Sequence, residues 1–286
     1  MHSIAFWEGR FMPIEEARVP VDDRGYVFGD GIYEVVMAFH RQPFAMDDHL
    51  ARWERSRDAM RLSCPYTAAQ ISELIHQAIA QVEGDELLAY FQVTRGISPR
   101  NHPFPPAGTP GSFLLTVRPH AHDVRAYEQG DTAVLVEDVR WHRCDIKSLN
   151  LIPNVMALQQ AVERGCTQAI FHRGDVVTEC GSSNVYIVRD GRILTHPLTC
   201  NILGGTTRAH ILSLAQALGM PVEERPFTVA ELYAADEAFS SSVAARPVSI
   251  VRVEDRPIGE GVPGPAVRAL QGAYRTLVKA QCGKEA

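Results

Sequence analysis

Lys147 is the residue of this chain best suited to covalent chemistry. Only three of the 28 basic residues are lysines, and two of them, Lys279 and Lys284, lie near the C-terminus. An arginine side chain stays protonated, whereas a lysine can lose its proton and then act as a nucleophile or form a Schiff base. A composition that uses arginine almost everywhere retains a lysine where a primary amine is needed, although a leftover surface lysine explains the count equally well.

Three other groups of polar residues have chemistry that could assist an amine. Glu179 is a lone carboxylate at the end of an apolar run, followed by small hydroxyl residues, a pattern also typical of a polar turn. Residues 203–207 (LGGTT) precede a helical pattern, where backbone N–H groups and the helix dipole can bind an anion, but an ordinary helix N-cap looks the same. Arg100 and His102 could converge on a carboxylate, since an arginine fork binds one through two hydrogen bonds.

Residue periodicity predicts the elements of the N-terminal part. Apolar residues of 47–62 recur among charges as in an amphipathic helix, and this helix carries Arg52, which could reach an anion or simply face solvent. A capping-box pattern, Thr67-x-x-Gln70, starts a second helix that ends before Gly84. β-Branched and apolar runs predict strands over 32–39, 87–94 and 112–117.

A long loop and a polar segment interrupt these elements. The loop 98–111 is rich in proline and glycine, and ordered loops of this length usually hold function. Residues 119–130 are polar and aperiodic, so we predict that they link a domain at 1–118 to a domain at 131–286.

The second half of the chain alternates short strands with helices. The predicted strands are 133–139, 169–172, 184–188, 237–241 and 248–253. The predicted helices are 154–164, 206–218 and 264–281, and Gly165 and Gly219 fit the position that follows a helix C-terminus. We therefore expect two layered domains of the α/β (α+β) class.

Composition excludes several classes of protein. A net charge of −6 and scattered arginines provide no basic surface for nucleic acid. No apolar run is long enough to span a membrane and the N-terminus has no targeting pattern, so we expect a cytoplasmic protein.

The six cysteines include no C-x-x-C pair, which argues against a disulfide framework or a zinc ribbon. His120, His122 and Asp123 have no further ligand cluster to complete a metal site, so no metal is predicted.

Taken in order, the patterns resemble those of one family. The blocks that carry the resemblance are 21–36 (VDDRGYVFGDGIYEVV), 47–56 (DDHLARWERS), 90–105 (YFQVTRGISPRNHPFP), 145–155 (DIKSLNLIPNV), 176–188 (VVTECGSSNVYIV) and 201–208 (NILGGTTR). They resemble the fold-type IV pyridoxal 5′-phosphate (PLP) aminotransferases and, within them, the D-amino-acid transaminases. The resemblance implies a smaller N-terminal α/β domain and a larger C-terminal PLP-binding domain with a β-barrel-like core flanked by helices.

The resemblance also implies roles for individual residues. Lys147 would form the Schiff base and carry the proton, and Glu179 would pair with the pyridine nitrogen, which keeps the ring an electron sink. The other cofactor contacts would come from Arg52, Ser182, Ser183, Leu203, Gly205, Thr206, Thr207, Ser242 and Val243. The substrate would be bound by Tyr33, Val35, Arg100 and His102. Arg100 and His102 would come from the partner subunit, so the resemblance implies a homodimer with shared active sites.

Two departures from the D-specific pattern follow the predicted strand 237–241. D-specific members have threonines and a serine where this chain has Ser242-Val243-Ala244-Ala245, so a hydroxyl contact to the phosphate is either lost or supplied by Ser242. Arg246 stands where a carboxylate is commoner. These changes bear on PLP affinity and substrate range rather than on the type of reaction.

The resulting hypothesis is transamination between a D-amino acid, such as D-alanine or D-glutamate, and a 2-oxo acid, such as 2-oxoglutarate or pyruvate, with ping-pong kinetics. Branched-chain L-aminotransferases, (R)-selective amine transaminases and aminodeoxychorismate lyases share the fold. Tyr33, Arg100 and His102 favour the D-amino-acid hypothesis, while Val243 keeps the amine transaminase open. A PLP- or metabolite-binding protein without turnover is the alternative from a different class.

Overall fold

The computed structural model describes residues 3–283, which form two compact units. Within the described residues, the first unit comprises 3–121, 146–150 and 278–283, and the second comprises 122–145 and 151–277. The first crossing between units falls inside the predicted linker 119–130, but no sequence pattern predicts that 146–150 and the C-terminal segment belong to the first unit. The predicted domain boundaries stay a prediction, and Lys284 lies outside the described residues.

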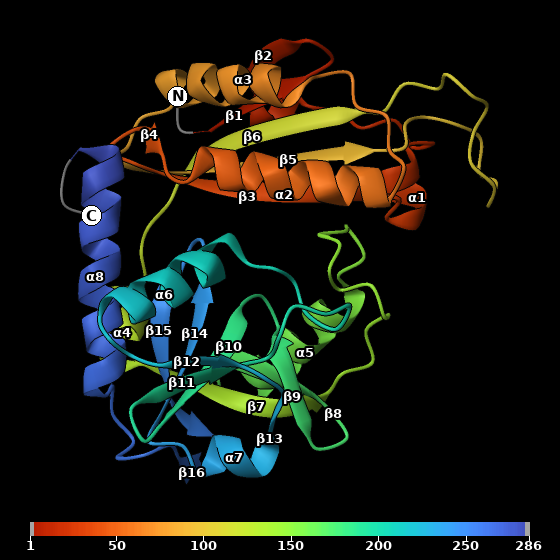
Figure 1. Ribbon diagram of the computed structural model, residues 1–286. Coiled ribbons are helices and arrows are strands. Elements are labelled where there is room, and N and C mark those ends of the chain that lie inside the picture. The colour runs from red at the N-terminus through yellow and green to blue at the C-terminus, as the bar shows by residue number, and fades with distance from the viewer. Residues whose placement is uncertain (1–2, 284–286) are drawn as a thin grey trace. The chain divides into compact units, whose positions relative to one another are not determined.

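The first unit is built on a six-stranded antiparallel sheet in the order β2-β1-β6-β5-β3-β4 (Figure 1). Its strands are β1 (Ile4–Trp7), β2 (Arg10–Pro13), β3 (Gly31–Phe39), β4 (Gln42–Pro43), β5 (Glu86–Thr94) and β6 (Phe113–Pro119). Its helices are η1 (Ile14–Glu16), α1 (Arg24–Phe28), α2 (Met46–Ala59) and α3 (Ala68–Gln81). The predicted capping box is confirmed, because Thr67 and Gln70 each accept a hydrogen bond from the other's backbone N–H.

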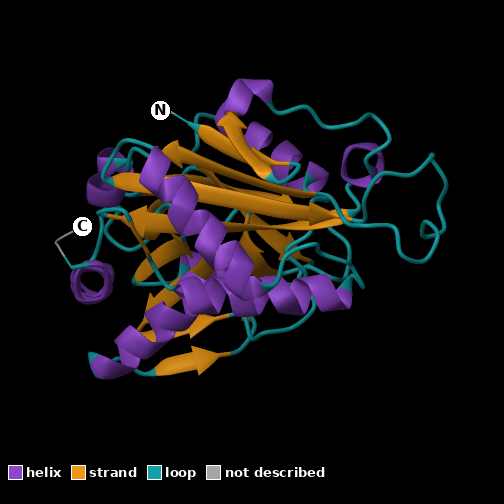
Figure 2. Ribbon diagram, turned by 90° about the horizontal axis from the view of Figure 1, so that it is seen from above, coloured by secondary structure: helices purple, strands orange, loops and turns teal. Residues whose placement is uncertain are grey.

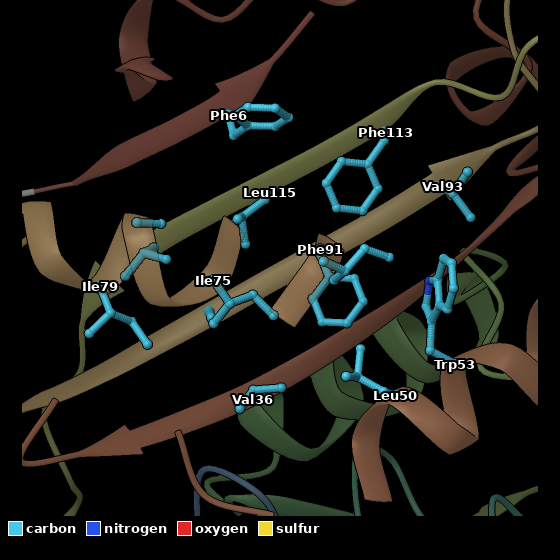
Figure 3. Close-up of a cluster of buried hydrophobic side chains, with 14 of the residues drawn as sticks. Phe6, Val36, Leu50, Trp53, Ile75, Ile79, Phe91, Val93, Phe113 and Leu115 are labelled. Carbon is cyan, nitrogen blue, oxygen red and sulfur yellow. The ribbon is translucent and has the colours of Figure 1, made fainter. Parts of the chain in front are cut away.

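The core of the first unit lies between the sheet and the two helices α2 and α3 (Figure 3). Alternate residues of β5 point into it, as the two-residue period of a strand requires, and these include Phe91 and Val93. They pack against Trp53 of α2 and Ile75 of α3, among others. Removing these side chains from water is the main force that holds the helices on the sheet.

The second unit contains a ten-stranded mixed sheet in the order β12-β11-β10-β14-β15-β7-β8-β9-β13, with β16 beside β15. Its strands are β7 (Asp131–Glu137), β8 (Gln168–Arg173), β9 (Val176–Cys180), β10 (Asn184–Arg189), β11 (Arg192–Thr195), β12 (Val222–Glu224), β13 (Phe227–Thr228), β14 (Glu237–Ser242), β15 (Arg246–Val253) and β16 (Arg256–Pro257). The sheet curls around a buried core that includes Ile170, Val185, Phe227 and Ile250 (Figure 1).

Helices surround this curled sheet. They are α4 (Val124–Gln129), α5 (Ile152–Glu163), α6 (Thr206–Ala217), α7 (Val229–Tyr233) and α8 (Pro265–Cys282), whose last residues belong to the first unit. Gly165 and Gly219 follow helix ends with φ of 68° and 73°, as predicted. The mixture of helices and strands confirms the predicted α/β class (Figure 2).

Among residues 3–283, no helix is both long enough and apolar enough to cross a membrane. The same residues contain no group of three or more His, Cys, Asp or Glu side chains arranged to hold a metal ion.

Candidate active site

Lys147 lies on a short segment, 146–150, that runs along the open part of β3. The Tyr33 N–H donates a hydrogen bond to the Lys147 carbonyl oxygen at 3.0 Å, and the Leu149 N–H donates to the Gly31 carbonyl oxygen at 3.0 Å. The Lys147 N–H donates to Ser56 Oγ of α2 at 3.2 Å. The segment is free to pair there because β4 covers only the far end of β3. A strand and a helix thus both fix the backbone that carries the lysine.

The Lys147 amine lies over the Tyr33 ring, with 4.2 Å between Nζ and the ring centroid. Tyr33 stacks on Tyr90 of the neighbouring strand, with 5.5 Å between ring centroids. Burial raises the pKa of the Tyr90 hydroxyl. Val35 shares the strand face of Tyr33, because residues two apart on a strand point the same way. The Lys147 amine therefore lies over the face of β3 that carries two of the predicted substrate contacts, Tyr33 and Val35.

The opposite face of β3 carries a buried ion pair that involves Arg52. Arg52 donates to both carboxylate oxygens of Glu34, from Nε at 2.9 Å and from Nη2 at 2.6 Å. His49 Nδ1 lies 3.2 Å from the same carboxylate, and the Glu34 side chain is fully buried. Burial alone would raise the pKa of Glu34, but the charge of Arg52 and the hydrogen bonds from His49 and Arg52 hold it far below its ordinary value. Burial lowers the pKa of His49.

Sequence reasoning missed Glu34 and His49. The alternation of Ile32 and Val36 toward the core marks the position between them as inward-facing, so a carboxylate there signals a buried partner. The missing information was the identity of that partner, which comes from the packing of α2 on β3.

Arg100 and His102 are exposed in the 98–111 loop and lie beside Phe28, the last residue of α1. The Phe28 ring centroid is 5.3 Å from the Arg100 guanidinium carbon and 5.5 Å from the His102 ring centroid. The two predicted carboxylate-binding side chains thus share one aromatic contact.

In the second unit, Glu179 lies one residue before the end of β9, as its sequence pattern predicted. One carboxylate oxygen accepts a hydrogen bond from Arg140 Nη1. The other accepts from the Leu203 N–H at 3.0 Å and from Asn184 Nδ2 at 3.3 Å. Burial raises the pKa of Glu179, whereas the Arg140 charge and these donors oppose the rise because they favour the ionised form.

Arg140 is itself held by a second buried carboxylate, Asp138. Asp138 accepts from Arg140 Nε and Nη2, each at 2.8 Å, and from Thr178 Oγ1 at 2.9 Å. The guanidinium carbon lies 4.4 Å from the centroid of the Phe171 ring. Sequence analysis missed Asp138 and Arg140, whose D-x-R spacing directly after β7 is too common to mark a site.

The start of α6 has the features of an anion site. Gly205 occupies the N-cap and has no side chain with which to cap the first-turn N–H groups, which lack intrahelical partners. A Cβ at Gly205 would lie 2.2 Å from Asn184 Oδ1, so the close approach requires glycine. Thr206 and Thr207 are buried in the first turn. A helix N-terminus without a side-chain cap is a common place for proteins to bind anions.

The remaining predicted contacts lie in two turns. Ser182 and Ser183 lie between β9 and β10, where the Cys180 N–H donates to the Ser183 carbonyl oxygen at 2.8 Å. Ser242 is the last residue of β14, and the three-residue turn 243–245, which contains Val243, connects it to β15. Ser242 Oγ accepts from the Ala245 N–H at 3.1 Å, so the altered turn retains one hydroxyl and uses it to close the backbone.

Comparisons with known proteins identify relatives of this chain. The amino-transferase class IV family model matches residues 31–253. The D-alanine aminotransferase of Staphylococcus haemolyticus is 38% identical over 276 residues, which cover 96% of this chain and 98% of that protein. A branched-chain aminotransferase from Thermoproteus uzoniensis, solved with norvaline, superposes with a TM-score of 0.86 at 27% identity, covering 96% of this chain and 94% of that one.

The fold is also that of the branched-chain amino acid aminotransferase of Escherichia coli. The TM-score is 0.90 at 24% identity, and the match covers 97% of this chain and 95% of that one. The predicted fold-type IV architecture is therefore confirmed. Because the family model spans most of the sequence and a relative above 30% identity covers nearly all of it, this chain belongs to the class IV aminotransferases.

Proposed function

We propose that this aminotransferase moves an amino group between a D-amino acid and a 2-oxo acid, with D-alanine or D-glutamate and pyruvate or 2-oxoglutarate as the pairs. The observation that carries this proposal is the likeness to a D-alanine aminotransferase over 96% of the chain. The presence of Tyr33, Arg100 and His102, which match the D-specific pattern, supports the same substrate class.

The cofactor is PLP, as in the class IV family. Residues of the second unit suit two parts of PLP. Glu179 offers a carboxylate to the pyridine nitrogen, and the N-terminus of α6 offers backbone donors to the phosphate. When bound, PLP supplies an electron sink for the electron pair left at the substrate Cα. We assign the other cofactor contacts to Arg52, Ser182, Ser183, Leu203, Gly205, Thr206, Thr207, Ser242 and Val243.

Lys147 is the proposed catalytic residue. Its primary amine would hold the cofactor and, when deprotonated, would accept a proton from the substrate Cα. The hydrogen bonds of its backbone to Tyr33 and Ser56 keep the carrier segment fixed while the side chain moves. Such positioning lowers the entropy cost of each proton transfer.

Glu179 supports the reaction through its charge. Arg140 and the Leu203 N–H favour the carboxylate form, which attracts a protonated ring nitrogen. Asp138 keeps Arg140, the charged partner of Glu179, in place.

The substrate carboxylate is assigned to Tyr33, Arg100 and His102, with Val35 beside it. We propose that Arg100 and His102 act in the site of a second copy of the chain, so that a homodimer shares its active sites. The exposure of both side chains in the single chain supports this assignment. The net charge of −6 and the scattered arginines support the proposal that the enzyme does not bind nucleic acid. We also propose that it is a cytoplasmic enzyme that acts on small metabolites and does not bind membranes.

A branched-chain L-aminotransferase is the second candidate, favoured by the likeness to the Thermoproteus uzoniensis structure. The identity to that protein is 27%, lower than the 38% to the D-alanine aminotransferase. The alternative assignment as an (R)-selective amine transaminase is supported only by Val243 in the turn after β14. Membership of an enzyme family and the retention of Lys147 speak against a binding protein without turnover.

Initial-rate kinetics test the proposed reaction. We expect parallel lines in double-reciprocal plots of rate against D-alanine at several fixed concentrations of 2-oxoglutarate, because Lys147 must complete one half-reaction before the second substrate binds. Lines that intersect would show that both substrates bind together and would rule out this scheme.

A further inference from the structure

The block 21–36 contains charged residues that the proposed reaction does not use. Arg24, at the start of α1, is buried and donates from Nε to Asp30 Oδ2 at 2.8 Å. Arg95 donates to the same carboxylate from Nε and Nη2, at 2.9 Å each to its two oxygens. One carboxylate therefore fixes two guanidinium groups, and charge-assisted hydrogen bonds of this kind are the strong ones in proteins.

Arg24 also binds the main chain of the 98–111 loop. Its Nη1 donates to the Asn101 carbonyl oxygen at 2.6 Å and its Nη2 to the His102 carbonyl oxygen at 3.4 Å. Its guanidinium carbon lies 4.8 Å from the centroid of the Phe28 ring, the same ring that Arg100 and His102 contact. Arg24 thus holds the backbone of the loop, while Phe28 contacts its two functional side chains.

The base of this loop is closed by further contacts. The Arg24 N–H donates to the Gly96 carbonyl oxygen at 3.0 Å. A Cβ at Gly96, whose φ is 90°, would lie 2.1 Å from the Pro110 carbonyl oxygen, so the two ends of the loop meet closely. The Arg95 guanidinium carbon lies 3.6 Å from the centroid of the Phe104 ring. A loop that extends from the end of the sheet is therefore anchored near α1 (Figure 1).

We propose that Arg24, Phe28 and Asp30 form a clasp that positions Arg100 and His102 to bind the substrate carboxylate. This inference rests on the proposed function, which assigns carboxylate binding to Arg100 and His102. The clasp residues act through the loop and are positioning residues. Their loss should weaken binding of both the amino acid and the oxo acid, because each carries an α-carboxylate, and should leave the Lys147 chemistry intact.

The test compares three variants of the holoenzyme. Arg24→Met removes the guanidinium and retains the length of the side chain, Arg100→Ala removes the proposed carboxylate ligand, and Arg55→Met replaces an exposed arginine of α2 as the matched control. Arg24→Met should raise the KM for D-alanine and for 2-oxoglutarate by about ten- to a hundredfold, the usual effect of losing hydrogen bonds to a charged group. Its kcat and the visible absorbance of its cofactor should match those of Arg55→Met.

The possible results distinguish a failure of the clasp proposal from a failure of the proposed function on which it rests. A raised KM in Arg100→Ala with an unchanged KM in Arg24→Met would overturn the clasp and leave the proposed function standing. An unchanged KM in Arg100→Ala would overturn the carboxylate assignment and the clasp together. A kcat lowered as much as KM is raised, or weakened cofactor absorbance, would show a general structural role for Arg24 and would also overturn the clasp.

A second variant and a second readout cover the case in which Arg24→Met does not fold. Phe28→Leu removes the shared ring without breaking a buried ion pair and should raise both KM values in the same way. Tryptic cleavage after Arg100 should also be faster in Phe28→Leu than in the unsubstituted enzyme, because the loop is released. Unchanged KM values with an unchanged cleavage rate would contradict the clasp.

Discussion

Replacing Lys147 by Ala is expected to lower kcat by at least about 10⁴-fold, because both proton transfer and covalent binding of the cofactor are lost. The substitution should spare the fold, since the Lys147 contacts to Tyr33 and Ser56 include backbone hydrogen bonds that alanine can also make. Turnover of D-alanine with 2-oxoglutarate and the visible spectrum of the purified protein measure the two effects.

Lys279→Ala is the matched control for this substitution, because Lys279 is an exposed lysine of α8. It should retain the activity and the visible absorbance of the unsubstituted protein. Far-ultraviolet circular dichroism should be the same for all three proteins. Substantial turnover by Lys147→Ala would remove this lysine from its catalytic role.

Replacing Glu34 by Gln is expected to lower the free energy of unfolding by about 3–5 kcal/mol, the usual cost of leaving a buried charge without its partner. The substitution leaves the Arg52 guanidinium beside a neutral amide, inside a core in which Glu34 is fully buried. Urea unfolding monitored by circular dichroism measures the loss. Glu54→Gln on α2 is the control, since the Glu54 side chain is 46% exposed and its pair with Arg57 spans 3.8 Å, so its loss should cost less than about 1 kcal/mol.

The stability difference at Glu34 should depend on pH in a defined direction. The folded state holds the pKa of Glu34 below its ordinary value, so the carboxylate contributes its full stability above the unfolded pKa of about 4.3. That contribution is lost as the pH falls from there toward the folded pKa. Equal stability of Glu34→Gln and the unsubstituted protein at neutral pH would show that the ion pair contributes nothing to the fold.

Composition singled out Lys147 as a candidate for chemistry, and the strands and helices that surround it follow from periodicity. The contacts that hold the backbone around Lys147 could not be predicted. The segment 146–150 pairs with β3, which is distant in sequence, and pairing between distant segments depends on the whole fold rather than on local pattern. The same reason explains why no pattern predicts that 146–150 belongs to the first unit.

The buried partners of charged residues also could not be predicted from the sequence. Sequence analysis identified Arg52 and Glu179, yet it gave neither Glu34 nor Arg140 as a partner. An isolated carboxylate or arginine looks solvated in a sequence, and only packing shows which ones lose water and therefore need a partner. Arg24 and Asp30 were likewise visible in a block of the resemblance, but their hold on a loop distant in sequence required the structure.

The visible spectrum of the purified protein, titrated separately with D-alanine, L-leucine and (R)-phenylethylamine and then with 2-oxoglutarate, tests the central claim most directly. We predict that D-alanine alone bleaches the cofactor absorbance and that the oxo acid restores it. Bleaching mainly by L-leucine or by the amine would contradict the D-amino-acid assignment and the roles given to Arg100 and His102.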